Sequence, residues 1–306
     1  MKRILIIYYS QTGQLTEIVK SVTSSLKEDE FSLIFEELRP RLPYPFPWSG
    51  KQFFQVFPES VLEIPCELES FGFNEEDRFD MVILAYQIWY LSASVPFNSF
   101  LRSPEAAKLI KGKPVVTIIG SRNMWIMAQK KVRKKIKDLG GSLVGNIVLI
   151  DRAPNLISVI TIIRWLIKGR REGRGGWKRL LPRAGVSEKD IKNAAKYGEL
   201  IGRALREKGL KKLQENLVQN GAVEINPVLM SIEKRGHMMF RIWARQILNK
   251  GPYNDPARDP LLGLFKYYLF FVLFLVSPMA SVVFFLLHKI NRRNTRKKIR
   301  YYSGLS

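Results

Sequence analysis

The chain has few of the side chains that metal sites, disulfides and nucleophilic enzymes are built from. Its 306 residues include one cysteine, Cys66, and two histidines, His237 and His288. A single cysteine excludes a disulfide within these residues and fits a reducing compartment. Neither histidine has a metal-ligating partner at the usual spacing. We therefore expect no metal site and no cysteine nucleophile.

Acidic residues are also scarce, and the charge is unevenly distributed. There are 50 Lys and Arg against 27 Asp and Glu, a net charge of +23. Residues 1–110 carry 10 basic and 15 acidic side chains, a net of −5, which leaves +28 for residues 111–306. Such a basic region predicts an anionic partner, either a nucleic acid or an anionic membrane surface.

One long apolar run decides between these partners. Residues 267–287, "YYLFFVLFLVSPMASVVFFLL", are 21 positions without a charge, and basic residues follow densely at 289–300. About 20 apolar residues match a hydrocarbon core of roughly 30 Å. This predicts a membrane segment and makes nucleic-acid binding unlikely. A single crossing would carry the basic tail outward, against the positive-inside tendency, whereas Pro278 allows a re-entrant segment.

The N-terminal part is predicted to be an α/β domain. Apolar runs at 4–9, 31–38, 81–86, 114–120 and 142–150 alternate with amphipathic helical patterns. Such runs indicate a doubly wound parallel sheet with helices on both faces. The run "KRILIIYYS" near Met1 is too short for a signal peptide, so we expect this domain to face the cytoplasm.

We divide the chain into three parts. Residues 1–207 form the sheet domain with an insertion at 151–186, residues 208–260 a basic helical connector, and residues 261–306 the membrane segment and basic tail. Within the insertion, an apolar stretch too short to span a bilayer precedes seven Lys or Arg between 164 and 179, with Trp165 and Trp177 among them. This pattern favours an interfacial helix on an anionic leaflet. The alternative is a lid helix packed on the sheet domain.

The ligand crevice of such a sheet lies beyond the carboxyl ends of its strands. The first loop there offers hydroxyls and backbone N–H groups at a helix N-terminus, and it has no P-loop lysine. A phosphate monoester fits this loop better than ATP or NAD. The candidate residues are Ser10, Gln11, Thr12, Gly13, Gln14, Leu15 and Thr16.

The sequence "YYSQTGQLT" after the first strand resembles the phosphate loop of the flavodoxin-like family, which binds FMN, although Leu15 stands where that family has Thr. The resemblance implies a five-stranded sheet in the order 2-1-3-4-5. It also implies an isoalloxazine site formed by the next two loops. The second loop contributes Tyr86, Gln87, Ile88, Trp89 and Tyr90, of which Trp89 and Tyr90 would stack on the ring. The third contributes Ser121, Arg122, Asn123, Met124 and Trp125, and its polar members would bind the pyrimidine edge.

A closer resemblance concerns function. "LRPRLPYPFPWS", "AYQIWYLS", "GSRNMWIMAQ" and the basic membrane tail are together similar to proteins identified as dialkylresorcinol condensing enzymes. This implies a membrane-anchored FMN oxidoreductase that aromatises a dialkylcyclohexanedione, a hydrophobic substrate. No carboxylate or histidine in the loops is an evident base, which leaves Tyr86, Tyr90 or solvent. The alternatives are a membrane-tethered electron carrier with a redox partner, or a non-enzymatic membrane scaffold without FMN.

Overall fold

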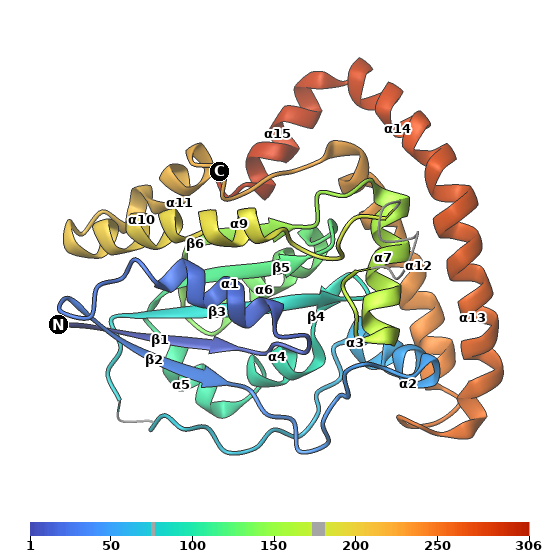
Figure 1. The fold of residues 1–306 in the computed structure, drawn as a ribbon, viewed down its shortest axis with the longest axis horizontal. Coiled ribbons are helices and arrows are strands. Elements are labelled where there is room, and N and C mark those ends of the chain that lie inside the picture. Colours follow the sequence, from blue (N-terminus) through green and yellow to red (C-terminus); the bar gives the residue numbers. More distant parts are fainter. Residues whose placement is uncertain (75–76, 173–180, 306) are drawn as a thin grey trace.

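The computed structural model describes residues 1–74, 77–172 and 181–305, and its centre is a parallel sheet (Figure 1). The five main strands are β1 (Lys2–Tyr8), β2 (Phe31–Glu37), β3 (Met81–Trp89), β5 (Pro114–Ser121) and β6 (Ser142–Ile150). They lie in the order β2-β1-β3-β5-β6 and pair in parallel. The predicted strands and their order are therefore confirmed. A short strand that was not predicted, β4 (Ser92–Ala93), pairs antiparallel with the end of β3.

Both faces of the sheet are covered by helices, because successive side chains of each strand point to opposite faces. On one face, Met81, Ile83 and Ala85 of β3 share a core with helices of the first and last parts of the domain. These helices are α1 (Gln14–Thr23), α9 (Glu188–Asn193), α10 (Ala195–Arg206) and α11 (Leu210–Gln219). On the other face, Val82, Leu84 and Tyr86 pack against the middle helices. Those are α4 (Val95–Phe100), α5 (Pro104–Ile110) and α6 (Ile126–Asp138).

The boundary of the sheet domain lies further along the chain than the sequence suggested. Helix α11 was assigned to the connector, yet its Leu213 and Leu217 are fully buried in the core beside β6. Gly145 of β6 makes this approach possible, since an added Cβ would lie 3.0 Å from the Leu217 side chain. The sheet domain therefore includes α11, and the connector begins after residue 219.

The two insertions lie beside the carboxyl ends of the strands. The first, between β2 and β3, forms two short helices, α2 (Gly50–Gln55) and α3 (Phe57–Leu62). The second forms α7 (Asn155–Lys168), in which Val159 and Trp165 are buried and only Ile160 and Lys168 are exposed. Most of its other apolar side chains are half-buried, so α7 lies against the domain, as the lid interpretation has it, and its contact with a membrane stays a prediction. The basic residues from 173 to 180, with Trp177, lie outside the described part of the chain.

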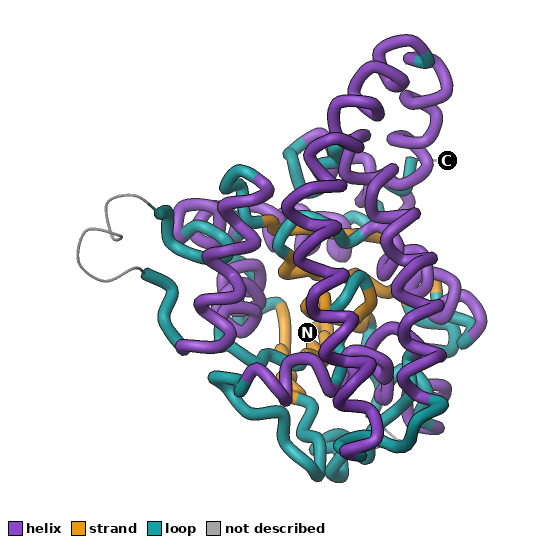
Figure 2. The backbone as a smooth tube through the Cα atoms, turned by 90° about the vertical axis from the view of Figure 1, so that its right-hand side faces the viewer, coloured by secondary structure: helices purple, strands orange, loops and turns teal. Residues whose placement is uncertain are grey.

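The C-terminal region is helical and lies along one side of the domain. It comprises α12 (Pro227–Leu248), η1 (Pro256–Arg258), α13 (Asp259–Phe271), η2 (Val272–Val276), α14 (Ser277–Ile290) and α15 (Arg292–Tyr302). Figure 2 shows the long helices side by side. The segment η2 is a π-helical turn in which the Ser277 N–H bonds to the Val272 carbonyl. Pro278 follows it, and a proline crowds the preceding turn of a regular helix.

The apolar segment is mostly exposed in this arrangement. Residues Pro256–Ile290 form the one helical stretch, within the described residues, that is long and apolar enough to cross a membrane by length and composition. Its most apolar window has a mean hydropathy of 2.6, and only 6% of that window is buried. The buried positions, among them Leu262, Phe265 and Leu269, share a separate core with α3 and α12.

Candidate functional site

The first loop after β1 has the geometry of an anion site. Helix α1 begins at Gln14, and its N-cap, Gly13, is exposed and adopts a left-handed conformation with φ of 81°. The N–H groups in the first turn of a helix have no acceptor within the helix. One of them, from Thr16, donates to the Ser10 hydroxyl at 3.3 Å. Ser10 and Thr12 are half-buried, so their hydroxyls and the neighbouring N–H groups can be reached by a phosphate.

Two side chains predicted for the site, those of Gln14 and Leu15, point away from the anion site. The Gln14 amide exchanges two hydrogen bonds of 3.0 Å with the backbone of Val186, which joins the loop to the segment after α7. Leu15 is 2% exposed and packs in the core against Gly120. At both residues only the backbone N–H is left for an anion. A hydroxyl in place of Leu15 would lie in an apolar core, which is the physical reason that this helix carries leucine there.

The second loop is a tight turn between β3 and β4 with its aromatic residues held in place. Tyr90 and Leu91 have positive φ values of 46° and 64°. The Tyr90 hydroxyl donates to the Phe53 carbonyl at 2.6 Å. Trp89 contacts the rings of Tyr44 and Trp48 at centroid distances of 5.1 and 5.2 Å. The proline-rich segment, residues 38–49, therefore covers Trp89 and leaves it 8% exposed.

The two tyrosines proposed as bases are buried differently. Tyr86 is stacked on Phe97 in the core and its hydroxyl bonds to the Gln129 side chain, so it does not reach the crevice. Tyr90 lines the crevice. Burial raises the pKa of both phenols well above the ordinary value. A base would need the phenolate, and burial disfavours that form.

The third loop is joined to the start of α7. The Arg122 guanidinium is within 3.1 Å of the Asn155 carbonyl, the Asn155 side-chain oxygen and the Ser158 hydroxyl. Burial lowers the pKa of Arg122 to about 10, so it remains a cation at neutral pH. Asn123 donates to the same Asn155 side chain at 2.8 Å. This loop therefore places a half-buried positive charge at the crevice and bonds it to the start of α7.

The other residues of this loop have structural partners. The Ser121 hydroxyl donates to the Met124 carbonyl at 3.2 Å. Trp125 is 2% exposed and immediately precedes α6. The buried carboxylate of Glu233, from α12, accepts the Met127 N–H at 2.6 Å. Glu233 thus joins the C-terminal region to the crevice, and nothing in its sequence context signalled this contact.

Among the residues that the structure describes, three buried polar atoms in or next to the crevice loops have no hydrogen-bond partner. Within residues 1–74, 77–172 and 181–305, the Trp48 Nε1, the Gln87 Nε2 and the Asn123 Oδ1 are buried without a hydrogen-bond partner. Leaving such a group unsatisfied costs about 1–3 kcal/mol. Trp48 lines the cavity, and Gln87 and Asn123 are next to lining residues, so two donors and one acceptor lie close to it. Such a set suits a heterocycle with carbonyl and N–H groups. The isoalloxazine ring of FMN is of this type.

A cavity of about 490 Å³ extends from this crevice. Its polar end is lined by Gln11, Trp48, Trp89, Tyr90, Ser121 and Arg122. Its other end is formed mainly by four elements that the sequence did not bring together, and the side chains that they contribute are apolar except for Lys266 of α13. The elements are α7 with Val159, Ile162, Ile163, Leu166 and Ile167, α12 with Ile232 and Phe240, and α13 and η2 with Leu269, Phe270 and Leu273. One cavity therefore joins a polar, aromatic site to an apolar one.

The structure brings most of the predicted loops together at one edge of the sheet. Gln11, Ile88, Trp89, Tyr90, Ser121, Arg122 and Met124 line the cavity, and the Gln11 N–H points to the Gln87 side chain at 3.4 Å. Trp48, Asn155 and the apolar helices were missed as site residues. The aromatic density around Trp48 was the signal that could have identified it. The described residues contain no group of three or more His, Cys, Asp or Glu that could hold a metal ion.

Comparisons with known proteins show similarity of fold. No protein-family model and no curated protein sequence matches the chain. An FMN-bound flavoprotein from Lactobacillus acidophilus is similar over 48% of this chain and 93% of its own, with 13% identity and a TM-score of 0.40. A flavodoxin from the domain Archaea is similar over 67% and 99%, with 11% identity and a TM-score of 0.35. A flavone reductase is similar over 68% and 64%, with 10% identity and a TM-score of 0.37.

These likenesses carry no conclusion about activity. The strand order β2-β1-β3-β5-β6 is itself the flavodoxin-type order of a doubly wound sheet. The chain therefore has a flavodoxin-like α/β fold with a helical C-terminal region, and its crevice lies where that fold binds its ligand.

Proposed function

We propose that this protein is an FMN-dependent oxidoreductase that attaches to a membrane and acts on a lipid-like substrate. The observation that carries the proposal is the single cavity, whose polar aromatic end suits a flavin and whose apolar end suits an alkyl chain. The phosphate would lie at the loop from Ser10 to Thr16, against the free N–H groups of α1. The ring would lie near Trp89 and Tyr90. Its carbonyl and N–H groups would supply the hydrogen-bond partners that the Gln87 Nε2 and the Asn123 Oδ1 lack within the described residues.

Residues of the chain would fix the ring and cover it in part. The half-buried Arg122 cation favours an anionic reduced ring. Helix α7, held by the Arg122 and Asn155 contacts, covers the crevice with apolar side chains. When bound, FMN supplies a two-electron acceptor that a second substrate must reoxidise. The apolar side chains that α7, α12, α13 and η2 place in the cavity would orient the substrate's alkyl chains.

The substrate class we propose is a 2,5-dialkylcyclohexane-1,3-dione. It would become a dialkylresorcinol by losing a hydride to the flavin and a proton to solvent. Solvent is the acceptor because burial raises the pKa of Tyr90 and Tyr86. The exposed apolar helix and the basic tail support attachment to an anionic membrane, with the sheet domain on the cytoplasmic side. Such a substrate would itself partition into that membrane.

FMN binding tests the first part of this proposal. The detergent-purified protein should quench the fluorescence of added FMN and be isolated yellow. Ser10→Ala and Thr12→Ala should each weaken FMN binding roughly tenfold, since hydrogen bonds to charged groups contribute about 1.5–3 kcal/mol. Ser24→Ala, at the exposed far end of α1, is the matched control and should bind as the wild type does. A chain that cannot be loaded with FMN would refute the proposal.

Turnover tests the second part. The FMN-loaded protein should bleach anaerobically on mixing with a dialkylcyclohexanedione, and a resorcinol should form in equal amount. Ile163→Trp, which fills the apolar end of the cavity, should slow bleaching by a long-chain dione much more than bleaching by a methylated one. Electron exchange with a reductase partner, without bleaching by any dione, would instead indicate an electron carrier.

A further inference from the structure

The apolar helix from α13 to α14 is fastened to the same domain at both of its ends. Where it begins, Arg258 is fully buried and its guanidinium lies 2.8 Å from the Glu59 carboxylate of α3. Next to it, Asp259 accepts a hydrogen bond of 2.9 Å from Gln55 of α2. The start of the helix therefore belongs to the packed part of the molecule.

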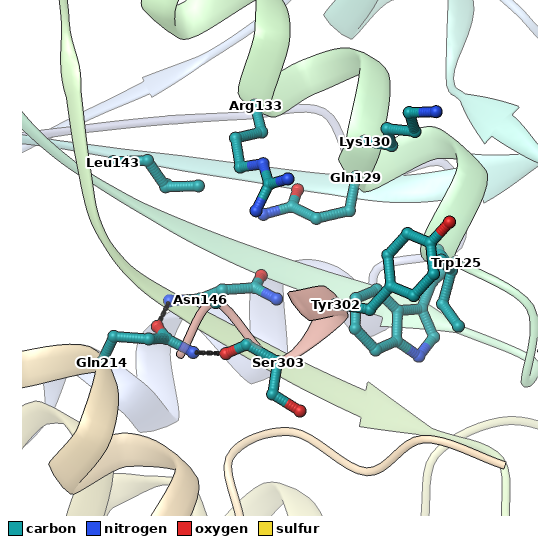
Figure 3. A pocket seen from close by; sticks show the side chains of 11 residues that line it. Trp125, Gln129, Lys130, Arg133, Leu143, Asn146, Gln214, Tyr302 and Ser303 are labelled. Carbon is teal, nitrogen blue, oxygen red and sulfur yellow. Dashed lines mark hydrogen bonds between the residues drawn. The ribbon is translucent and has the colours of Figure 1, made fainter. Parts of the chain in front are cut away.

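The tail beyond the helix returns to the opposite end of the domain. In Figure 3, Gln214 of α11 donates to the Ser303 carbonyl at 2.7 Å and accepts the Asn146 N–H of β6 at 2.7 Å. Tyr302 lies beside Trp125 in the same view, and the two line a cavity of about 220 Å³. The Arg133 guanidinium lies 4.5 Å from the centre of the Tyr301 ring. Both ends of the apolar helix thus contact one domain.

Helix α12 runs antiparallel beside the apolar helix for most of its length. Ser231 contacts His288 at 2.9 Å, Arg235 lies 4.4 Å from the Phe284 ring, and Phe240 contacts Phe265. Along this length α12 exposes the cations Lys234, Arg235, Arg241 and Arg245. Any level of the bilayer occupied by the apolar helix would also be occupied by this cationic neighbour.

These cations make a crossing costly. An Arg or Lys at the centre of a membrane helix costs about 2.5–3.5 kcal/mol. A crossing would also separate the tail from the domain that it contacts, because the two would lie on opposite sides. Placing the helix flat at the surface avoids both costs, since the apolar outer face can enter the acyl region while the cations of α12 and α15 meet anionic headgroups.

We propose that the apolar helix lies in the plane of one leaflet of an anionic membrane and does not cross it. This inference rests on the membrane attachment proposed above. The surface that would meet the lipid comprises the exposed apolar side chains along this helix. They are Leu264, Tyr267, Phe271, Phe274, Leu275, Val276, Met279, Val282, Val283, Phe285, Leu286, Leu287 and Ile290. The basic tail then stays on the side of the sheet domain, in accord with the positive-inside tendency.

Depth measurements on the full chain test the orientation. Leu264, Leu275 and Leu286 are spaced by three helical turns and are each more than half exposed. Each is replaced by cysteine in a Cys66→Ser background, spin-labelled and bound to vesicles of phosphatidylethanolamine and phosphatidylglycerol. The flat helix predicts the same shallow depth at all three positions. A crossing helix, about 33 Å between the outer two at 1.5 Å per residue, would place the middle label deepest and the outer labels at opposite surfaces.

Labelling in cells gives an independent readout. Asn294→Cys on the exposed side of α15 and Asp29→Cys on the sheet domain are treated with an impermeant maleimide. The two should react alike, both only after permeabilisation. Reaction of Asn294→Cys alone in intact cells would overturn the inference. Flotation with the same vesicles tests attachment separately: a soluble dimer that does not float would refute attachment itself, while flotation with a graded depth profile would refute only the flat orientation.

Discussion

Helices α10 and α14 are of similar length, and they use their apolar residues in opposite ways. In α10, Tyr197, Ile201 and Leu205 are buried, and the exposed positions are all charged: Lys196, Glu199, Arg203 and Arg206. In α14, Ser277 is the one buried residue, and the exposed positions are mostly apolar up to the basic residues at its end. Helix α10 exposes only charged side chains to water, whereas α14 exposes an apolar surface that water solvates poorly.

The difference separates two parts of the molecule by where their apolar side chains lie. The sheet domain buries apolar surface on both of its faces. The C-terminal helices bury a smaller core and leave an apolar strip beside cations. A continuous apolar strip of this extent marks an interaction surface, and its cationic border favours lipid over another protein surface.

The largest expected effect comes from making α14 resemble α10. Replacing Met279, Val283 and Leu286 together by glutamine should weaken vesicle binding roughly a thousand-fold, since each buried apolar side chain contributes about 1.5–3 kcal/mol. The three side chains are more than half exposed, so thermal unfolding in detergent should change little. Flotation measures the first effect. The control replaces Lys196, Glu199 and Arg203 of α10 by glutamine, and equal loss of binding in this control would contradict the comparison.

A second comparison replaces one helix glycine by alanine in each part of the molecule, Gly198 in α10 and Gly263 in α13. An alanine Cβ at Gly198 of α10 would lie 1.9 Å from the Val22 carbonyl oxygen of α1. Gly198→Ala should therefore destabilise the sheet domain by about 3 kcal/mol, because the backbone of α1 must move. At Gly263 of α13 nothing lies within 4 Å, and Gly263→Ala should stabilise the helix by about 1 kcal/mol. Denaturant unfolding measures both, and a destabilised Gly263→Ala would show that α13 packs more closely than described.

A smaller effect concerns pH and helix α12, which joins the two parts. Burial raises the pKa of Glu233 to about 7, so its contribution to the free energy of unfolding falls as the pH rises from about 4.5 to 7. Burial and the nearby cations Lys131 and Arg241 lower the pKa of His237 to about 4. Its contribution therefore rises as the pH rises from about 4 to 6.5. Each is on the order of 3 kcal/mol, and the two oppose each other.

Single variants should separate these two opposing dependences of the free energy of unfolding on pH. Relative to the wild type, Glu233→Gln should become more stable as the pH rises between about 4.5 and 6.5. Over the same range, His237→Gln should become less stable. Unfolding by denaturant at several pH values gives the slopes, and two variants with identical slopes would contradict the assignment.

The strands and their order could be predicted because buried parallel strands leave a strong signal. The strand predicted at 142–150 is found at Ser142–Ile150, and the one predicted at 114–120 ends one residue later. Both faces of these strands are covered, so their sequences are mostly apolar, and the polar Thr117 and Asn146 bond to each other. The loops that line the crevice followed from the same assignment, since parallel strands end at one edge.

The other parts of the fold and of the candidate site could not be predicted, because they depend on contacts between distant segments. The apolar run in α7 could have faced lipid or protein, and only its packing over the crevice distinguishes the two. The Leu213 and Leu217 pair of α11 could have faced any partner, and Glu233 resembled an ordinary surface residue of a basic helix. Trp48 lies in a proline-rich stretch with no periodicity. A local pattern does not specify which distant surface such residues meet.

The carboxylate of Glu233 links α12 to the third loop of the crevice, and this fastening has a mechanical consequence. Helix α12 cannot tilt relative to the sheet without breaking the bonds to the N–H groups of residues 125–127. A protein that rests on a surface through the neighbouring helix would therefore present its crevice at one fixed angle to that surface. A flat, coloured ring held in the crevice would make the same angle with the bilayer in every molecule. Aligned bilayers would therefore absorb light polarised parallel to the bilayer plane and light polarised perpendicular to it to different extents.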